Sequence, residues 1–399
     1  MLDAVANSEA GQKPSRDVDF ASAGPGTPGG IFLRKFWQPI CISSELAVGK
    51  AKPIHVMGEK YTLYRGHSGS PYIVGFRCSH RLTQLSTGWV KDDAIQCMYH
   101  GWAFDGGGRC ILRPGEDPSG PAPGANIKGI PTKEHAGLIY GYFGLGEAPP
   151  FPPFPDFSET GAIENFSCEL PCNWFQTYEN HIDEVHVAFV HSFGGSHTKL
   201  GRALQLPEIN AYETPYGMVR ETKAGQGGLR ATLYLFPNTM RIIIPSFNDL
   251  KHVGSMNGMS GWRDAYVTLV PTDDENHILY ITQLAQIGPD EAEEHRSSWE
   301  KFQRRISEYP PAKHVAAEIL AGKYSLYDVL DHPLLVIVED AVAQGGQGAI
   351  ADRANEHLGR TDIGIVRMRR VFAREYKAIM EGKPTKNWVY SGEPPVRGF

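Results

Sequence analysis

The stretch that decides the fold runs from residue 78 to residue 105 and reads CSHRLTQLSTGWVKDDAIQCMYHGWAFD. It opens with Cys78 and His80, separated by one residue, and 16 residues later it offers Cys97 and His100, separated by two. Each pair supplies one thiolate and one imidazole from a short loop, and two such loops can close around a metal centre. The pattern therefore predicts a metal site made of four side chains.

Two kinds of metal centre fit these four ligands. Zinc would take them in a tetrahedral structural site, whereas a Rieske [2Fe–2S] cluster has two cysteines on one iron and two histidines on the other. A zinc-finger helix usually carries two histidines together, but here each loop mixes cysteine with histidine. Gly101-Trp102-Ala103-Phe104-Asp105 follows directly and resembles the tail of the Rieske signature. These features favour the cluster, with structural zinc as the alternative.

Composition narrows the class of protein further. The chain has 399 residues and a formal net charge of −6, which argues against a nucleic-acid-binding protein. No apolar run approaches the roughly 18 residues of a membrane helix, and no secretory signal opens the chain. Six cysteines are too few for a disulfide scaffold and suit a reducing cytoplasm. We expect four of them to be small buried hydrophobes, namely Cys41, Cys110, Cys168 and Cys172.

The sequence predicts three parts. Residues 1–39 form an N-terminal arm and helix that pack on the catalytic domain. Residues 40–150 carry short β-like runs between glycine-rich turns and form a small antiparallel β domain. A proline-rich connector over 148–155 breaks regular structure. The catalytic domain, residues 151–399, has a helix over 170–192, β-like runs between 208 and 285, and helices over 290–322 and 360–382.

A second group of metal-binding residue types lies in the helix expected over 170–192. Asp183, His186 and His191 follow a D-x₂-H-x₄-H spacing. Asp183 and His186 share a helix face, but His186 and His191 diverge by about 140° on a regular α-helix. The two histidines can point together only where the helix is broken or locally widened. The spacing therefore predicts an irregular helix.

Two imidazoles and one carboxylate, with coordination positions left open, are the ligands of non-haem Fe(II) oxygenases. The carboxylate can come from Glu339 or Asp340, which end an apolar segment. Taken alone, two adjacent acids are more often a solvated helix face. Beside two histidines and the first motif, we expect one of them to complete an iron site.

From about residue 24 to residue 380 the chain resembles the α subunit of Rieske non-haem iron oxygenases, in particular the phthalate-dioxygenase-like and aromatic O-demethylase branch. Besides the two motifs, the resemblance rests on segments such as Gly24-Pro25-Gly26-Thr27-Pro28, Asn173-Trp174 and Glu356-His357-Leu358-Gly359. It implies an α+β fold, in which an N-terminal all-β Rieske domain precedes a helix-grip (START-like) antiparallel sheet with helices. The chain departs from the family pattern at three positions: Ser79 replaces the usual proline, Leu82 replaces the usual glycine, and Thr83 follows.

The resemblance also implies the role of each site residue. The ligands of a [2Fe–2S] cluster would be Cys78 and Cys97 on one iron and His80 and His100 on the other. The ligands of a mononuclear Fe(II) would be His186, His191 and Asp340. Asp183 would bridge His186 to a cluster histidine of the neighbouring subunit and so give electrons a short path.

The implied activity is that of a terminal oxygenase in a multicomponent system. It would use O₂ to hydroxylate, dihydroxylate or O-demethylate a small aromatic substrate, with an aromatic carboxylate as the expected class. Electrons would come from NAD(P)H through a separate flavin and ferredoxin-type reductase, because the chain lacks a G-x-G-x-x-G fingerprint. The family implies a bacterial, cytoplasmic homotrimer or a stack of trimers, with no nucleic-acid or membrane partner. The alternative is a Rieske-type electron carrier without a catalytic iron.

The substrate pocket should lie over the iron and be largely apolar. The expected lining residues are Phe175, Val187, Val190, Leu235, Met240, Ile242 and Phe247. A cation would suit a carboxylate substrate, and the candidates are Arg220, Arg230 and Arg241.

Overall fold

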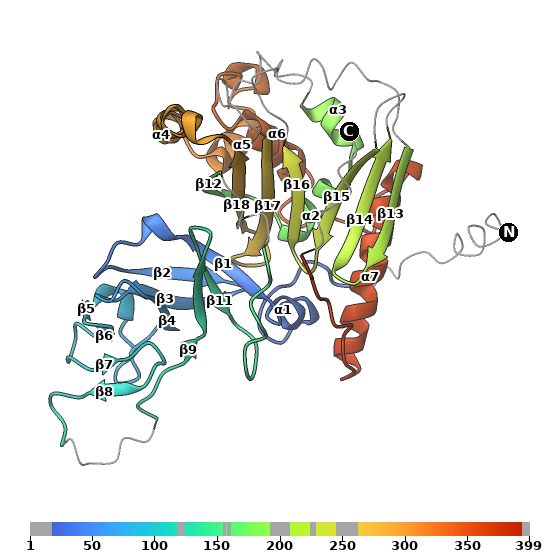
Figure 1. Ribbon diagram of the computed structural model, residues 1–399. Helices are drawn as coiled ribbons and strands as arrows, with labels where there is room; N and C mark the ends of the chain where they lie inside the picture. Colours follow the sequence, from blue (N-terminus) through green and yellow to red (C-terminus); the bar gives the residue numbers. More distant parts are fainter. Residues whose placement is uncertain are drawn as a thin grey trace.

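The computed structural model describes residues 18–117, 124–154, 157, 161–191, 208–223, 229–244 and 262–392. Three small antiparallel sheets come from residues 37–142, and a seven-stranded antiparallel sheet begins at residue 162. In Figure 1 the small sheets, coloured blue to teal, lie beside one end of the large sheet. Helices accompany the large sheet, which confirms the predicted α+β fold.

The small sheets consist of short strands joined by tight turns. The first contains β1 (Trp37–Ile42), β11 (Leu138–Tyr142) and β10 (Thr132–His135), in that order. The second contains β2 (Ala51–Val56), β3 (Glu59–Arg65), β4 (Pro71–Gly75) and β9 (Gly129–Ile130). The third contains β5 (Trp89–Lys91), β6 (Ala94–Gln96), β7 (Ala103–Phe104) and β8 (Cys110–Leu112).

The large sheet has the strand order β12-β18-β17-β16-β15-β14-β13. Its strands are β12 (Ala162–Leu170), β13 (Glu208–Thr214), β14 (Gly217–Lys223), β15 (Leu229–Leu235), β16 (Thr239–Ile244), β17 (Trp262–Pro271) and β18 (His277–Gln286). Five of the six pairings join strands that are consecutive in sequence, and only β12 pairs with a distant strand, β18. The chain between β12 and β13 leaves the sheet to form the helices that carry the second histidine motif.

The helices are α1 (Pro28–Leu33), α2 (Trp174–Ile182), α3 (Val185–Val190), α4 (Ala292–Glu308), α5 (Ala312–Leu320), α6 (Leu335–Gly345) and α7 (Ile363–Met380). Short 3₁₀ turns lie at Ser43–Glu45, Leu85–Thr87, Pro289–Glu291, Leu326–Val329 and Arg360–Asp362. The helix predicted over 360–382 corresponds to α7. The helix predicted over 170–192 is indeed irregular, because it is two helices, α2 and α3. Among the described residues, no helix combines the length and the apolar character that a bilayer span requires.

Side chains alternate between the two faces of the large sheet. On the inner face, Tyr234 packs against Tyr178 of α2 with ring centroids 5.9 Å apart, and Phe236 packs against Phe372 of α7 at 4.8 Å. Burial of each such ring contributes on the order of 1.5–3 kcal/mol. On the outer face, Leu233 and Leu235 belong to a separate apolar cluster. The inner face is therefore the one that meets the helices.

Hydrogen bonds join the small sheets to the large one. The Met57 N–H donates to the Pro271 carbonyl at 2.7 Å, and the Gly58 N–H donates to the Thr272 carbonyl at 2.8 Å. The buried Asn238 side chain donates from Nδ2 to Gln38 Oε1 at 2.7 Å. These bonds fix the two regions relative to each other.

Candidate metal centres

The first motif lies in two loops that share one backbone geometry. In the loop after β4, the Thr83 carbonyl accepts from the Cys78 N–H at 2.8 Å, and the Cys78 carbonyl accepts from the Leu82 N–H at 2.9 Å. Leu82 has a φ of +59°, in the left-handed region that favours glycine. The backbone at this position therefore needs a positive φ, which the glycine that is usual in the family adopts more readily than Leu82 does.

The loop between β6 and β7 repeats this arrangement. The Trp102 carbonyl accepts from the Cys97 N–H at 2.8 Å, and the Cys97 carbonyl accepts from the Gly101 N–H at 3.0 Å. Gly101 occupies the position equivalent to Leu82 and has a φ of +74°. The two loops thus form a matched pair that presents its cysteines in the same way.

The four side chains of the motif separate into a buried pair and an exposed pair. Cys78 and Cys97 are each 2% exposed, whereas His80 and His100 are exposed with ring centroids 4.6 Å apart. The His80 ring stacks on Trp102 at 4.8 Å. Burial and the neighbouring Cys97 raise the pKa of the Cys78 thiol to about 11, so metal binding would have to displace the thiol proton. A buried sulfur pair below an exposed nitrogen pair suits a two-iron cluster better than a single tetrahedral ion.

The second motif surrounds the break between α2 and α3. Asp183, just after α2, is extended with a φ of −75° and a ψ of 126°, and α3 starts at Val185. One oxygen of Asp183, Oδ1, accepts from the Val185 N–H at 2.8 Å. Because the chain kinks at this point, residues five apart in sequence can face a common point.

His186, His191 and Asp340 are brought together there. Their nearest ligand atoms all lie within 4.8 Å of one another. Asp340 Oδ1 lies 3.8 Å from His186 Nε2 and 3.5 Å from His191 Nε2. Ligands about 2.1 Å from a shared metal at tetrahedral to octahedral angles stand about 3–3.5 Å apart. The donor set therefore fits a mononuclear metal, and two imidazoles with one carboxylate are suited to ferrous iron.

The opposite ring nitrogen of each histidine faces a carboxylate. His191 Nδ1 lies 2.9 Å from Glu339 Oε2, and His186 Nδ1 lies 3.6 Å from Asp183 Oδ2. Burial alone would lower the pKa of His191, but Glu339 and Asp340 outweigh it and raise the pKa. Burial alone would raise the pKa of Asp183, but His186 and nearby backbone N–H groups lower it. A carboxylate behind each imidazole leaves both Nε2 atoms for a metal.

Sequence reasoning missed two functional neighbours. It treated Glu339 only as a rival to Asp340, whereas Glu339 is 1% exposed and holds His191. It did not single out Asn180, whose Nδ2 lies 3.3 Å from Asp340 Oδ1 and 3.4 Å from His186 Nε2. The signal for Asn180 was available, because it lies one helical turn before Asp183.

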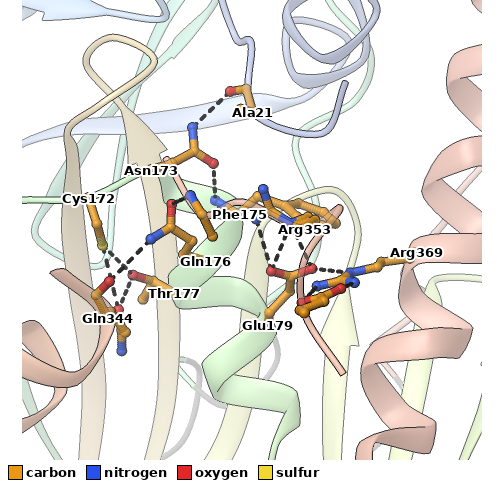
Figure 2. A network of polar contacts seen from close by, with 12 residues as sticks. Ala21, Cys172, Asn173, Phe175, Gln176, Thr177, Glu179, Gln344, Arg353 and Arg369 are labelled. Carbon is orange, nitrogen blue, oxygen red and sulfur yellow. Dashed lines mark hydrogen bonds and ion pairs between the residues drawn. The ribbon is translucent and has the colours of Figure 1, made fainter. Parts of the chain in front are cut away.

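A polar network anchors α2 to the chain that follows α6 (Figure 2). Glu179 lies between two arginines: Arg353 donates to it at 2.9 Å, and Arg369 of α7 donates from its other side. Arg369 also pairs with Glu356. Near the start of α2, the Gln176 side chain donates to the Gln344 carbonyl of α6 at 3.2 Å. The helix that leads to Asp183 is therefore held by residues about 170–190 positions away.

A cavity of about 380 Å³ lies beside this network. Its lining includes Asn180 and Asp183, together with the acids Glu179, Asp352 and Glu356. Arg369 is the one arginine among its lining residues. Asp183 thus borders both the proposed iron site and an acidic hollow at the surface.

Four of the expected pocket residues lie on α3 or on the inner face of the sheet, and their role in a pocket stays a prediction. Val187 and Val190 are on α3, beside the histidines. Met240 and Ile242 are on the inner face of the sheet, where they join the core beneath α2. The expectation for Phe247 lies outside the described residues.

Three expected pocket residues lie elsewhere, and these expectations are corrected. Phe175 is fully buried in the core, where its ring centroid lies 5.0 Å from that of Phe20 and 5.0 Å from that of Phe372. Leu235 and Arg241 alternate along their strands with residues of the inner face, so their side chains lie on the outer face. Arg241 is paired there with Asp264 at 3.3 Å.

The remaining cysteines form no disulfide. Cys41 and Cys172 are buried, and Cys110 and Cys168 are half-buried. Burial raises the pKa of the Cys172 thiol to about 11. This agrees with the interpretation of these residues as reduced packing residues.

Comparison with known proteins places this geometry in a family. Residues 36–132 match the family model described as the Rieske [2Fe-2S] domain. The chain is 30% identical over 387 residues to the 5,5'-dehydrodivanillate O-demethylase oxygenase subunit of Sphingobium sp. (strain NBRC 103272 / SYK-6), covering 92% of this chain and 81% of that protein. It is 29% identical over 373 residues to the tert-butanol monooxygenase / tert-amyl alcohol desaturase oxygenase subunit of Aquincola tertiaricarbonis, covering 88% of this chain and 74% of that one.

A solved structure supports the same fold. The crystal structure of dicamba monooxygenase bound to dicamba matches with a TM-score of 0.64, covering 88% of this chain and 99% of that one at 17% identity. The predicted resemblance is confirmed, and an electron carrier without a catalytic domain is disfavoured, because the similarity extends far beyond the cluster region. The chain belongs to the Rieske non-haem iron oxygenases and is an oxygenase subunit of that family.

Proposed function

We propose that Cys78, His80, Cys97 and His100 hold the [2Fe–2S] cluster, and that His186, His191 and Asp340 hold a mononuclear ferrous iron at which O₂ oxidises the substrate. The observation that carries this proposal is the convergence of two Nε2 atoms on Asp340 Oδ1 at 3.5 and 3.8 Å. When bound, the iron supplies the site at which O₂ is activated by electrons from the cluster. The proposed division is an arm over 1–39, a cluster domain over 40–150 and a catalytic domain over 151–399.

The protein groups around the iron have separate tasks. Glu339 accepts a hydrogen bond from His191 Nδ1–H and so selects the tautomer with a free Nε2. Asp183 Oδ2 faces His186 Nδ1 at 3.6 Å, so its negative charge favours a proton on that nitrogen without a direct hydrogen bond. Asn180 is a neutral hydrogen-bond donor beside Asp340 and holds that carboxylate in place. With these groups in place, His186, His191 and Asp340 would offer a metal three protein ligands.

We propose that electrons reach Asp183 from the cluster of a neighbouring copy, in a head-to-tail trimer or a stack of trimers. Asp183 and Asp352 line the acidic cavity beside Glu179 and Glu356, whose charges are paired with Arg353 and Arg369. The exposed cluster histidines are flanked by Arg77 and Arg81, which are also exposed. The two surfaces are complementary in charge, and a head-to-tail contact that closes after three copies is the symmetry that pairs them. A separate NAD(P)H-dependent reductase in a bacterial cytoplasm would supply the electrons.

We propose a small aromatic substrate, with aromatic ethers favoured over carboxylates. On the described inner face, each arginine is already paired: Arg220 and Arg230 with Glu184, and Arg263 with Glu164. Arg220 and Arg230 share the single carboxylate of Glu184, so a carboxylate substrate would have to compete with Glu184 for one of them. O-demethylation, the reaction named for the Sphingobium relative, fits such a pocket.

The assignment of the iron site is tested by iron analysis of the purified protein under anaerobic conditions. We expect three irons per chain and a Rieske EPR signal on reduction. Two irons per chain with that signal would favour an electron carrier, and absence of the signal would contradict the cluster. His186→Ala should retain the signal, lose one iron and lose turnover. His314→Ala, which changes an exposed histidine of α5, is the matched control.

The substrate class is tested by reductase-coupled O₂ uptake across a panel. The panel contains methoxyarenes, aromatic carboxylates and branched aliphatic alcohols. We expect uptake coupled to formaldehyde release with methoxyarenes. Coupled turnover with the alcohols alone would contradict the aromatic assignment.

A further inference from the structure

We propose that Arg220 is a positioning residue that sets the break between α2 and α3 and thereby aligns Asp183 and His186. This inference rests on the proposed iron site. Arg220 is on β14, on the inner face of the sheet, and is 4% exposed. Among the described residues, Arg220 forms no hydrogen bond or ion pair with His186 or His191. Its effect would pass through the backbone that carries them.

Arg220 uses both terminal nitrogens to hold the break. Nη1 donates to the His181 carbonyl at 3.1 Å. Nη2 lies 2.5 Å from Glu184 Oε2 and donates to Thr232 Oγ1 at 3.1 Å. His181 precedes the break and Glu184 follows Asp183, so one guanidinium spans the kink. The planar fork of arginine suits this bridging role better than the point charge of lysine.

The His181 carbonyl needs a new donor because of the break. In a continuous helix it would accept from the Val185 N–H, four residues on. That N–H instead donates to Asp183 Oδ1 at 2.8 Å. Arg220 and the hydroxyl of Tyr234, at 2.5 Å, take its place. Two side chains of the sheet therefore donate to the His181 carbonyl, which in a regular helix would accept from the Val185 N–H. These two hydrogen bonds stabilise the kinked conformation.

The kink in turn fixes both oxygens of Asp183. Oδ1 caps α3 through Val185, and Oδ2 faces His186 Nδ1 at 3.6 Å. If the kink relaxed towards a continuous helix, Val185 would return to His181, and Asp183 would lose its link to α3. His186 would then rotate away from His191, as the five-residue spacing requires.

Glu184 supplies the charge that keeps Arg220 in place. It is 14% exposed and pairs with Arg220 and, at 3.4 Å, with Arg230. The Arg230 side chain is 43% exposed. It pairs with the Glu184 carboxylate and, among the described residues, does not donate to the His181 carbonyl. Arg230→Met is therefore a matched control, because it removes a positive charge from the same carboxylate without removing the bridge.

A substrate-binding role for Arg220 is the competing explanation. Its Nε is buried and has no hydrogen-bond partner among the described residues. Nη1 and Nη2, however, already have three acceptors, one of which is the Glu184 carboxylate that Arg220 shares with Arg230. The two explanations differ in what they change: a positioning residue alters ferrous affinity without substrate, whereas a substrate contact alters KM alone.

The test is ferrous binding to the full-length, cluster-loaded protein after chelation of the mononuclear iron. Wild type, Arg220→Met, Arg220→Lys, Arg230→Met and the double variant Arg220→Met/Glu184→Gln are titrated with Fe²⁺ alone. The EPR signal of the nitric oxide complex reports occupancy, and the reduced Rieske signal checks the cluster. Thermal unfolding is recorded in parallel.

We expect Arg220→Met to weaken ferrous affinity about 10–100-fold with an unchanged Rieske signal. Arg220→Lys should be intermediate, and Arg230→Met should stay within about twofold of wild type, because it leaves the bridge intact. The double variant leaves no unpaired buried carboxylate, so it should recover thermal stability but not ferrous affinity.

Two outcomes would overturn the inference: wild-type affinity in Arg220→Met, or recovery of both stability and affinity in the double variant. A change in KM with unaltered ferrous affinity would assign Arg220 to the substrate instead. Failure of the wild type itself to bind ferrous iron would overturn the proposed function, which separates the two conclusions.

Discussion

Two adjacent acids, Glu339 and Asp340, have different tasks because an α-helix turns them about 100° apart. Asp340 points to both Nε2 atoms, whereas Glu339 reaches His191 Nδ1 from a position that is 1% exposed. The residue pattern alone could place an acid at this point of the chain but could not choose between the two, and the choice of Asp340 came from the family resemblance. The choice depends on the rotation of α6 against α3, which is set by packing.

This division predicts distinct losses for the two acids. Asp340→Ala removes a ligand and should abolish ferrous binding. Glu339→Gln keeps the shape but removes the charge, and we expect ferrous affinity to fall about 10–100-fold. Titration of chelated protein with Fe²⁺ measures both. Equal losses in the two variants would contradict the separate roles.

Leu82 is in a left-handed conformation that costs an L-residue about 1–2 kcal/mol. Glycine would remove this cost but lose about 0.5–1 kcal/mol through its freer unfolded chain. Because Leu82 is 61% exposed, little burial is lost. We expect Leu82→Gly to stabilise the cluster region by about 0.5–1 kcal/mol, measured by thermal loss of cluster absorbance.

The control for this prediction is Leu112→Gly. Leu112 is 47% exposed at the end of β8, an extended strand, where glycine brings only its entropic cost. It should lower the same thermal midpoint. A decrease with Leu82→Gly as well would show that the leucine side chain matters more than its backbone.

His277 makes the stability of the catalytic domain depend on pH. Burial lowers its pKa to about 4, although its Nδ1 donates to the Cys172 carbonyl at 2.8 Å. The unfolded imidazole titrates near 6.5. The contribution of the neutral ring is therefore complete above pH about 6.5 and is lost as the pH falls to about 4. The linked loss is about 3 kcal/mol.

The measurement is urea unfolding between pH 7.5 and pH 4, with wild type compared with His277→Gln. Glutamine retains a donor for the Cys172 carbonyl but does not titrate. The variant should show a flatter dependence of unfolding free energy on pH. Parallel curves for the two proteins would exclude His277 as a source of acid sensitivity.

At the scale of elements, the break between α2 and α3 was predictable and the residues that hold it were not. The spacing of His186 and His191 already excluded a regular helix. The clamp from Arg220 and the anchors from Arg353 and Arg369 come from a strand, a loop and a helix far away in sequence. Local periodicity carries no information on such contacts.

Strand parity explains the errors in the pocket prediction in the same way. Met240 and Ile242 lie on the inner face of the sheet, whereas Arg241 between them faces the other side. A sequence of alternating residues reveals two faces but does not say which one meets the helices.

The anchoring of α2 leads to a stability prediction. Glu179 is 8% exposed at its side chain and pairs with Arg353 and Arg369. Glu179→Gln would leave two poorly exposed guanidinium groups without that carboxylate, and we expect a loss of about 3–5 kcal/mol. Glu213→Gln, which breaks the partly exposed pairs with Arg374 and Lys386, should cost about 1 kcal/mol or less. Chemical denaturation of the cluster-loaded protein compares the two.

At the scale of the whole molecule, the fold class and the two metal motifs were predictable, because each depends on short spacings of rare residue types. The relation between the two sites was not. It depends on contacts such as those from Met57 and Gly58 to the turn after β17. These contacts hold the cluster region at one end of the large sheet (Figure 1).

The proposed head-to-tail assembly predicts complementation between two inactive chains. Cys97→Ser lacks the cluster, and His186→Ala lacks the mononuclear iron. If each iron receives electrons from a neighbour's cluster, co-expressed chains mixed at random in equal amounts should recover about a quarter of wild-type turnover. Each variant alone is the control. No recovery in verified mixed oligomers would contradict transfer between subunits.

The loops that we propose for the cluster and the residues that we propose for the iron differ in how much of the chain must be synthesised before they can come together. The proposed cluster ligands lie between residues 78 and 100. One loop follows β4 of the second small sheet, and the other joins β6 to β7 of the third. The proposed iron site needs Asp340, and α2, which leads into the helix that carries the histidines, is held by Arg353 and Arg369. During synthesis on the ribosome, the cluster loops can fold while most of the catalytic domain is still unmade. We therefore expect the nascent chain to acquire its iron–sulfur centre first and its ferrous ion only after release.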